Sequence, residues 1–131
     1  MKELKIEAKT ENLEVVLDFV NNELNRHNYP PKQQGEIDLA VEEIFLNIAN
    51  YAYTPGMGEA AIFISVNEKT VIRFEDTGKP YNPLEQKEPD LDKSLSEREI
   101  GGLGIFLVKK LMNHVEYQRI QNKNILTISN E

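Results

Sequence analysis

The sequence contains no cysteine and no tryptophan. A chain without thiols forms neither disulfide bonds nor cysteine-based metal sites, and it suits a reducing compartment. The first ten residues alternate polar and apolar side chains, so they lack the apolar run of about 7–15 residues that marks a secretory signal. No stretch reaches the roughly 18 consecutive apolar residues of a membrane span. These absences favour a cytoplasmic protein that does not enter a membrane.

Positive charge is also scarce. The 15 lysine and arginine residues are outnumbered by 22 aspartate and glutamate residues, which gives a formal net charge of −7. Direct nucleic acid binding is disfavoured, because it normally depends on a basic surface. Any phosphate group that the chain binds must be held by local backbone N–H groups, by Mg²⁺ and by a few basic side chains.

Two common nucleotide-binding motifs are missing. The chain has no G-x-x-x-x-G-K-[ST] sequence and no G-x-G-x-x-G after a strand. A standard P-loop and a Rossmann site are therefore excluded. A phosphate-binding role has to come from a different arrangement of glycines.

What is present is the pattern of a single α+β domain. Residues 1–131 suffice for one domain with its own core, and no repeat or linker divides them. We expect a two-layer sandwich: a mostly antiparallel mixed sheet of about five strands, covered on one face by about three helices. Periodicity places strands at 2–8, 60–66, 70–75, 115–121 and 125–129, a turn at Asn122-Lys123-Asn124, and helices at 11–26, 32–53 and 103–112.

The helix around residues 37–53 is the most informative element. Its apolar side chains form two flanks, and the narrow polar stripe between them carries Glu36, Glu43, Asn47 and Asn50. Glu43 and Asn47 are neighbours because they are four residues apart. A carboxylate in such a furrow suits a general base, since burial moves its pKa toward neutrality, and an adjacent amide oxygen suits Mg²⁺. The alternative is that Glu43 pairs with a lysine and Asn47 is merely solvated.

Two glycine-containing segments add to this helix. The segment 101–105, GGLGI, opens an apolar helical run, where free N–H groups and the helix dipole favour a phosphate. A flexible hinge is the alternative. The segment 76–80, DTGKP, follows a strand, and its aspartate suits an exocyclic amine such as N6 of adenine. A simple strand-ending turn is the alternative there.

Together the three motifs, in this order and spacing, resemble the N, G1 and G2 boxes of GHKL ATPases. The matching segments are Glu43-x-x-x-Asn47, Asp76-x-Gly78-x-Pro80-Tyr81-Asn82-Pro83 and Gly101-Gly102-Leu103-Gly104-Ile105-Phe106-Leu107-Val108. The similarity spans about residues 40–117. Within that superfamily the chain is most similar to the short stand-alone anti-sigma-factor serine kinases, which the run 111–117 also resembles.

The resemblance implies a role for each matching position. Glu43 would be the general base that activates a partner's serine hydroxyl, and Asn47 would ligate the Mg²⁺ that bridges the ATP phosphates. Asp76 would accept from adenine N6, Gly78 would give the base room, and residues of about 84–100 would form a lid. The implied nucleotide-binding set is Asn47, Asn50, Tyr51, Asp76, Gly78, Pro80, Tyr81, Gly101, Gly102, Leu103, Gly104 and Ile105.

Three positions depart from the family pattern. Tyr51 stands where many relatives have a histidine, and Ile100 stands where some kinase members have an arginine. Arg98 and Lys79 are candidate replacements as phosphate-side cations. Ile125 stands near the position at which kinase members often offer a threonine to adenine. These departures bear on kinase activity more than on nucleotide binding.

As a whole, the resemblance implies an ATP- and Mg²⁺-dependent protein-serine kinase. It would bind a sigma factor, phosphorylate a small antagonist protein, and form a homodimer through its N-terminal strand and first helix. Three alternatives stay open. They are a nucleotide-binding regulatory module with weak or no kinase activity, a structural domain with accidental motifs, and the catalytic half of a sensor histidine kinase. The last needs a phospho-accepting histidine in a helical hairpin, which neither His27 nor His114 supplies.

Overall fold

The computed structural model of the chain describes residues 1–85 and 102–130. Its strands form one sheet in the order β1-β2-β3-β5-β4, and each neighbouring pair is antiparallel. The sheet is thus antiparallel throughout the described chain, without a parallel pair. The strands are β1 (Lys2–Glu7), β2 (Glu59–Val66), β3 (Thr70–Asp76), β4 (His114–Ile120) and β5 (Lys123–Asn130).

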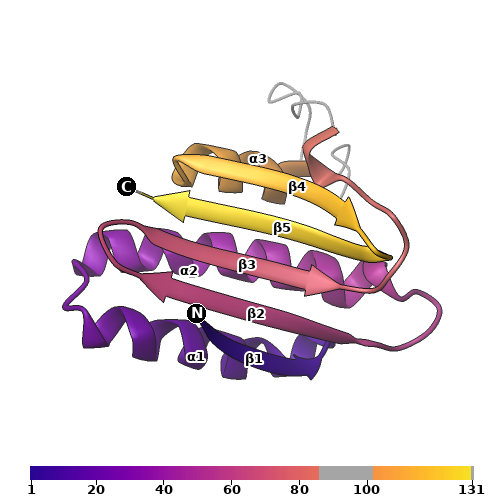
Figure 1. The fold of residues 1–131 in the computed structure, drawn as a ribbon, viewed down its shortest axis with the longest axis horizontal. Helices are drawn as coiled ribbons and strands as arrows, with labels where there is room; N and C mark the ends of the chain where they lie inside the picture. Colours follow the sequence, from indigo (N-terminus) through magenta and orange to yellow (C-terminus); the bar gives the residue numbers. More distant parts are fainter. Residues whose placement is uncertain (86–101, 131) are drawn as a thin grey trace.

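Helices pack on one face of this sheet, as Figure 1 shows. They are α1 (Leu13–Arg26), α2 (Pro31–Asn47) and α3 (Gly102–Leu111), and α2 continues into a π-helical turn at Ile48–Ala52. Such π turns are rare and often occur at functional sites. Short 3₁₀ turns lie at Thr10–Asn12 and Pro83–Glu85. The expected two-layer α+β sandwich is confirmed.

The core lies between the sheet and the helices. Each helix places aliphatic residues at helical spacing toward the sheet, and each inner strand alternates buried and half-buried residues. Full burial of one such side chain contributes about 1.5–3 kcal/mol. This packing fixes α2 against the strands, and the fully buried side chains include Val16, Val20, Leu24, Ile37, Val41, Phe45, Ile62, Ile72 and Ile128.

The connection between β4 and β5 differs from the sequence-based expectation. Gln121 and Asn122 both have positive φ, at 50° and 66°, and Ile120 pairs directly with Lys123. A two-residue turn with positive φ at both positions matches the right-handed twist of a hairpin. The expected turn over residues 122–124 is therefore wrong. Because β5 starts at Lys123, Asn124 is a strand residue with a defined face.

None of the helices in residues 1–85 and 102–130 has both the length and the apolar composition required to cross a bilayer. The longest of them, α2, has 17 residues and carries the polar stripe described above.

Candidate functional site

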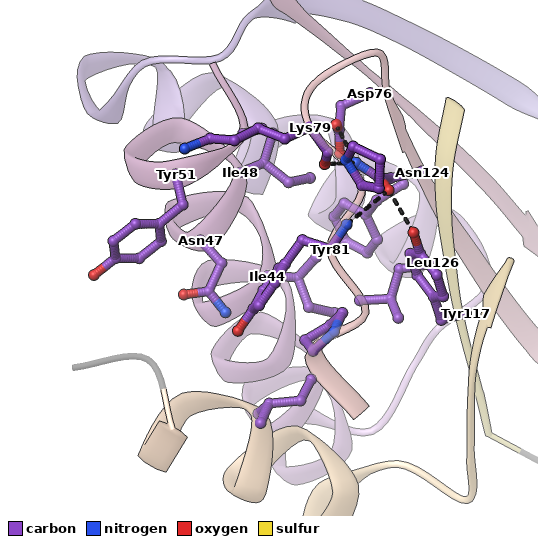
Figure 2. Close-up of a pocket in the computed structure, with 15 residues that line it drawn as sticks. Ile44, Asn47, Ile48, Tyr51, Asp76, Lys79, Tyr81, Tyr117, Asn124 and Leu126 are labelled. Carbon is purple, nitrogen blue, oxygen red and sulfur yellow. Dashed lines mark hydrogen bonds between the residues drawn. The ribbon is translucent and has the colours of Figure 1, made fainter. Parts of the chain in front are cut away.

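A cavity of about 340 Å³ opens between α2 and the sheet, where β3 ends and β5 begins. Its walls are mostly apolar and include Ile44, Ile48, Phe74, Pro83, Ile105 and Leu126. A few polar side chains join them, and Figure 2 shows Asp76, Asn124 and Tyr117 close together on the strand side. A cavity of this size and lining suits a flat, largely apolar ring with polar groups at its edge.

The α2 side of the cavity is built by successive helical turns. Asn47 and Tyr51, four residues apart, both line it, and Figure 2 places them opposite Asn124 and Tyr117. Within the described chain, the half-buried Asn47 side chain makes no hydrogen bond, so its amide is available to a ligand. Asn50 is exposed on the π-helical turn and does not line the cavity.

Asp76 ends β3 at the cavity and is only 7% exposed. Its Oδ1 accepts hydrogen bonds from the Gly78 N–H at 2.9 Å and from the Asn124 side-chain amide at 3.0 Å. Its Oδ2 accepts none from residues 1–85 or 102–130. Because this oxygen has no partner in the described residues, it can accept from a ligand that brings a hydrogen-bond donor.

The turn that follows Asp76 is held by groups from distant elements. The Tyr53 hydroxyl accepts from the Thr77 N–H at 2.8 Å and donates to the Glu59 carbonyl at 2.6 Å. From β4, the Arg119 guanidinium donates to the Gly78 carbonyl at 2.9 Å. These contacts fix the backbone at the cavity, so Asp76 sits on a rigid support.

Gly78 is required by a close approach of two backbones. A Cβ at this position would overlap the carbonyl group of Ala52 in the π-helical turn. The Lys79 N–H donates to that same carbonyl at 3.0 Å. The resemblance assigned Gly78 to giving the base room, whereas the nearest obstacle to a side chain here is Ala52. Packing against α2 is thus a sufficient reason for glycine.

Asn124 and Tyr117 also line the cavity, although sequence reasoning did not select them. Asn124 lies opposite Asp76 across the β3–β5 pair, whereas Ile125 lies opposite Glu75 and is directed to the other face. The expectation that places Ile125 at the site is therefore wrong, since Asn124 lines the cavity and Ile125 does not. A two-residue reading of the preceding hairpin turn would have placed Asn124 in β5, but its pairing with Asp76 depends on tertiary contact.

Glu43 lies half-buried where α2 meets α3, one helical turn before Asn47. Its carboxylate touches Gly104, where a Cβ would overlap Oε2. Burial raises the pKa of the Glu43 carboxyl above its ordinary value of 4.5, and the neighbouring Glu42 raises it further. Glu43 does not line the cavity itself. It lies next to Ile44, which lines the cavity, and the direction of its pKa shift is the one that suits a general base.

Most of the site positions predicted from the sequence fall into three groups: those that line the cavity, those at the start of α3, and those outside the described residues. The nucleotide-binding candidates that line the cavity are Asn47, Tyr51, Asp76, Pro80, Tyr81 and Ile105, joined by the candidate cation Lys79. Gly102, Leu103 and Gly104 form the first turn of α3. The positions that lie outside the described residues are Arg98, Ile100, Gly101 and all of the lid segment beyond residue 85.

A protein-caged metal finds no support in the described part of the chain. No group of three or more histidine, aspartate or glutamate side chains there could hold a metal ion. Mg²⁺, however, commonly uses one or two protein ligands together with waters and substrate phosphates. The free amide of Asn47 fits a metal that arrives with a nucleotide.

Comparison with known proteins agrees with this geometry. A model of the histidine kinase-like ATPase domain matches residues 6–130. The serine/threonine-protein kinase BtrW of Bordetella bronchiseptica is 29% identical over 107 residues, covering 79% of this chain and 75% of that protein. The serine-protein kinase RsbW of Bacillus thuringiensis is 26% identical over 129 residues, covering 95% of this chain and 81% of that protein.

A solved structure has the same fold. The crystal structure of the RsbU and RsbW domains of a Mycobacterium tuberculosis protein matches this chain with a TM-score of 0.63 at 12% identity. The match covers all of this chain but only 32% of the larger one. At this identity the similarity supports the fold alone.

Proposed function

Because this chain belongs to the histidine kinase-like ATPase domain family, we propose that it is an ATP-dependent protein-serine kinase of the anti-sigma-factor type. In this role it acts in the cytoplasm, binds a sigma factor and phosphorylates a small antagonist protein. The observation that carries the proposal is Asp76, a buried carboxylate beside an apolar cavity, with one oxygen already held by two donors. The names of the similar proteins BtrW and RsbW support the choice of reaction.

The cavity would bind the nucleotide by its base. Ile48, Phe74 and Leu126 line it with apolar surface that excludes water from a flat ring. Asp76 accepts a hydrogen bond from the exocyclic amine of adenine, for which a carboxylate is a good acceptor. These residues position the ligand without any help from the net charge of the protein.

The phosphate end would be served by α2 and α3. Bound Mg-ATP supplies the phosphoryl group and part of the charge neutralisation that transfer requires. Asn47 would offer its amide oxygen to the metal, and the N–H groups in the first turn of α3, from Gly102 to Gly104, would donate to phosphate oxygens. Glu43 accepts the proton of the serine hydroxyl of the partner.

Two measurements test this proposal. The first is calorimetric titration with ADP and with ATP in the presence of Mg²⁺. The second uses γ-labelled ATP and the antagonist protein captured by a pull-down from native cell extract with and without ADP. Labelling of a serine by the wild type and its loss in Glu43→Gln support the kinase. Tight ADP binding without labelling of the captured antagonist contradicts it.

One observation favours a second candidate, a regulatory module that binds nucleotide and a partner but transfers little phosphate. Glu43 does not line the cavity, and its carboxylate lies against Gly104. If this arrangement persists with nucleotide bound, the base is held away from the partner. ADP-dependent capture of the partner that is unchanged in Glu43→Gln, without any labelling, distinguishes this candidate.

The resemblance also implies a homodimer, which we include in the proposal. A homodimer has twice the monomer mass of 15.1 kDa. Light scattering of the purified chain measures this directly, and a monomer mass at all concentrations contradicts the dimer without affecting the nucleotide site.

A further inference from the structure

Asn124 is a nearly buried amide at the cavity, with 7% of its surface exposed. Its side-chain nitrogen donates to Asp76 Oδ1 at 3.0 Å and to the Lys79 carbonyl at 2.8 Å. Its oxygen accepts from the Tyr117 hydroxyl at 2.5 Å and from the Tyr81 N–H at 3.4 Å. All of its hydrogen-bonding capacity is therefore used by the protein.

The orientation of this amide is fixed by the chemistry of its neighbours. A carboxylate and a backbone carbonyl accept hydrogen bonds only, so the nitrogen must face Asp76 and Lys79. A backbone N–H donates only, so the oxygen must face Tyr81. A flipped amide would break each of these contacts. The Tyr117 hydroxyl is then forced to donate to the amide oxygen.

This network decides how the Asp76 carboxylate is turned. The terminal torsion of an aspartate is broad, so hydrogen-bond donors must select its angle. The Gly78 N–H and the Asn124 amide both bind Oδ1. As a result the two oxygens are not equivalent, and Oδ2 is the acceptor left for a molecule in the cavity.

A fixed carboxylate matters because a free one does not choose between purines. Adenine presents a donor at C6, whereas guanine and hypoxanthine present an oxygen there and a donor at N1. A carboxylate that rotates could accept from either set. A carboxylate held in one orientation is matched to one donor position, and a base with an oxygen in that place leaves an acceptor facing an acceptor.

We propose that Asn124, itself held by Tyr117, is a positioning residue that orients Asp76 and thereby makes the cavity selective for adenine over 6-oxopurine nucleotides. The inference rests on the proposed function, because it requires that the cavity binds the base of a nucleotide. It goes further by naming the determinant of base selectivity, which sits on β4 and β5 and outside the recognised motifs.

The test compares ADP with IDP, whose base has a C6 oxygen, by calorimetry with Mg²⁺. Wild-type protein should prefer ADP by about tenfold or more, the usual effect of a hydrogen bond to a charged group. In Asn124→Leu, which keeps the branched shape and the number of side-chain heavy atoms but removes both polar atoms, the ratio should fall to within about threefold of unity. Tyr117→Phe loses one hydroxyl only and should give an intermediate ratio.

Thr127→Ser provides the matched control, because Thr127 lies on β5 but faces away from the cavity. It should keep the wild-type ratio. A merely structural role for Asn124 would weaken ADP and IDP binding equally and leave the ratio intact, so the ratio separates positioning from folding. If Asn124→Leu fails to fold, Tyr117→Phe carries the same comparison.

The outcomes separate this inference from the proposed function. A wild-type ratio well above one that collapses in Asn124→Leu or falls in Tyr117→Phe supports it. A ratio near one in the wild type, or a ratio unchanged in both variants, overturns it while nucleotide binding stands. Absence of binding of either nucleotide to the wild type overturns the proposed function and this inference with it.

Discussion

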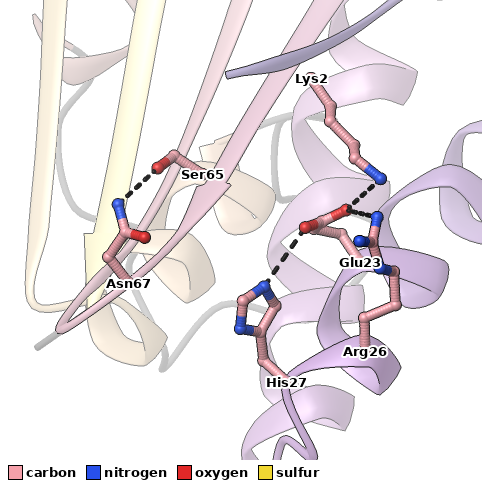
Figure 3. Close-up of polar contacts among 6 residues, drawn as sticks. All are labelled: Lys2, Glu23, Arg26, His27, Ser65 and Asn67. Carbon is pink, nitrogen blue, oxygen red and sulfur yellow. Dashed lines mark hydrogen bonds and ion pairs between the residues drawn. The ribbon is translucent and has the colours of Figure 1, made fainter.

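Two carboxylates in this molecule are held in opposite ways. Asp76 is held on one oxygen by neutral donors, the Gly78 N–H and the Asn124 amide. Glu23, on α1, is contacted by a lysine, an arginine and a histidine, as Figure 3 shows. Lys2 Nζ and Arg26 Nη1 lie 3.0 Å and 3.6 Å from Glu23 Oε2, and His27 Nε2 lies 3.3 Å from Oε1.

The difference separates a carboxylate with one oxygen open to a ligand from a carboxylate that links two elements of the fold. Both oxygens of Glu23 are occupied by the protein, so the cluster joins β1 to α1 and offers nothing to a ligand. Asp76 keeps Oδ2 open among the described residues, and its neutral partners fix its angle without cancelling its charge. A carboxylate whose angle is fixed by neutral donors and whose second oxygen is open suits a site that recognises a hydrogen-bond donor.

Glu43 extends the comparison, because within the described chain its carboxylate has neither neutral donors nor cations. The largest effect is expected from Glu43→Gln. Loss of a general base typically slows proton-coupled transfer by about 10²–10⁴-fold, while ADP affinity should change little because Glu43 does not line the cavity. Single-turnover transfer from γ-labelled ATP, with calorimetry on the same samples, measures both.

The raised pKa of Glu43 also sets the direction of two pH effects. Transfer needs the ionised form, so its rate should rise with pH through a value above 4.5. The contribution of this carboxyl group to folding stability changes with pH in the opposite direction. The folded state favours the protonated carboxyl, so its contribution is full at low pH and is lost as pH rises through the folded-state pKa. Glu43→Gln should therefore melt no lower than wild type at neutral pH, and a lower melting temperature there would contradict this account.

Asp76→Asn tests the carboxylate that keeps one oxygen open. Asparagine can still accept from the Gly78 N–H, so the turn should survive, but the charged acceptor for the base is lost. ADP affinity should fall by about 10–150-fold, the range for a hydrogen bond to a charged group. Glu23→Gln is the matched control and should bind ADP within about twofold of wild type. Equal losses in the two variants would remove the distinction drawn between them.

Gly78→Ala tests the support beneath Asp76. The added methyl group would overlap the Ala52 carbonyl, and overpacking of this kind costs about 1–3 kcal/mol. Gly35→Ala is the matched control, since a Cβ on Gly35, in the second turn of α2, would have no atom within 4 Å apart from the nearby backbone of its own helix. It should gain up to about 1 kcal/mol from helix propensity. Urea unfolding of both variants checks the two signs, and a stable Gly78→Ala would show that the backbones are not in tight contact.

Much of this arrangement follows from the sequence. The periodicity of residues 37–53 predicts a helix with two apolar flanks. The flank of Ile37, Val41 and Ile44 is indeed in the core, whereas Leu39 on the other flank is 49% exposed. The spacing from Glu43 to Asn47 correctly places these two side chains on one stripe. Local rules are sufficient here because helical geometry alone determines which side chains are neighbours.

The part that failed depends on strand register. The sequence pattern places Asn124 in a turn, and asparagine is a common turn residue. The actual turn uses Gln121 and Asn122 with positive φ, and this choice shifts the start of β5 by two residues. A two-residue shift of the start brings Asn124 into the strand, opposite Asp76. The sequence contains no local signal for that pairing, because it is set by tertiary contact with β3.

The smallest effect is expected at Glu23, whose carboxylate links β1 to α1. Lys2 and the Arg26 side chain are more than half exposed, so solvent screens these pairs and Glu23→Gln should cost no more than about 1 kcal/mol. The hydrogen bond from Lys2 is the main cause that lowers the pKa of Glu23 from 4.5. A lowered carboxyl pKa contributes stability above the unfolded-state value, and this is lost as pH falls through the folded-state value. The difference in melting temperature between wild type and Glu23→Gln should therefore be present at pH 7 and vanish in acid. A difference that persists at low pH would mean that Glu23 acts through packing instead of charge.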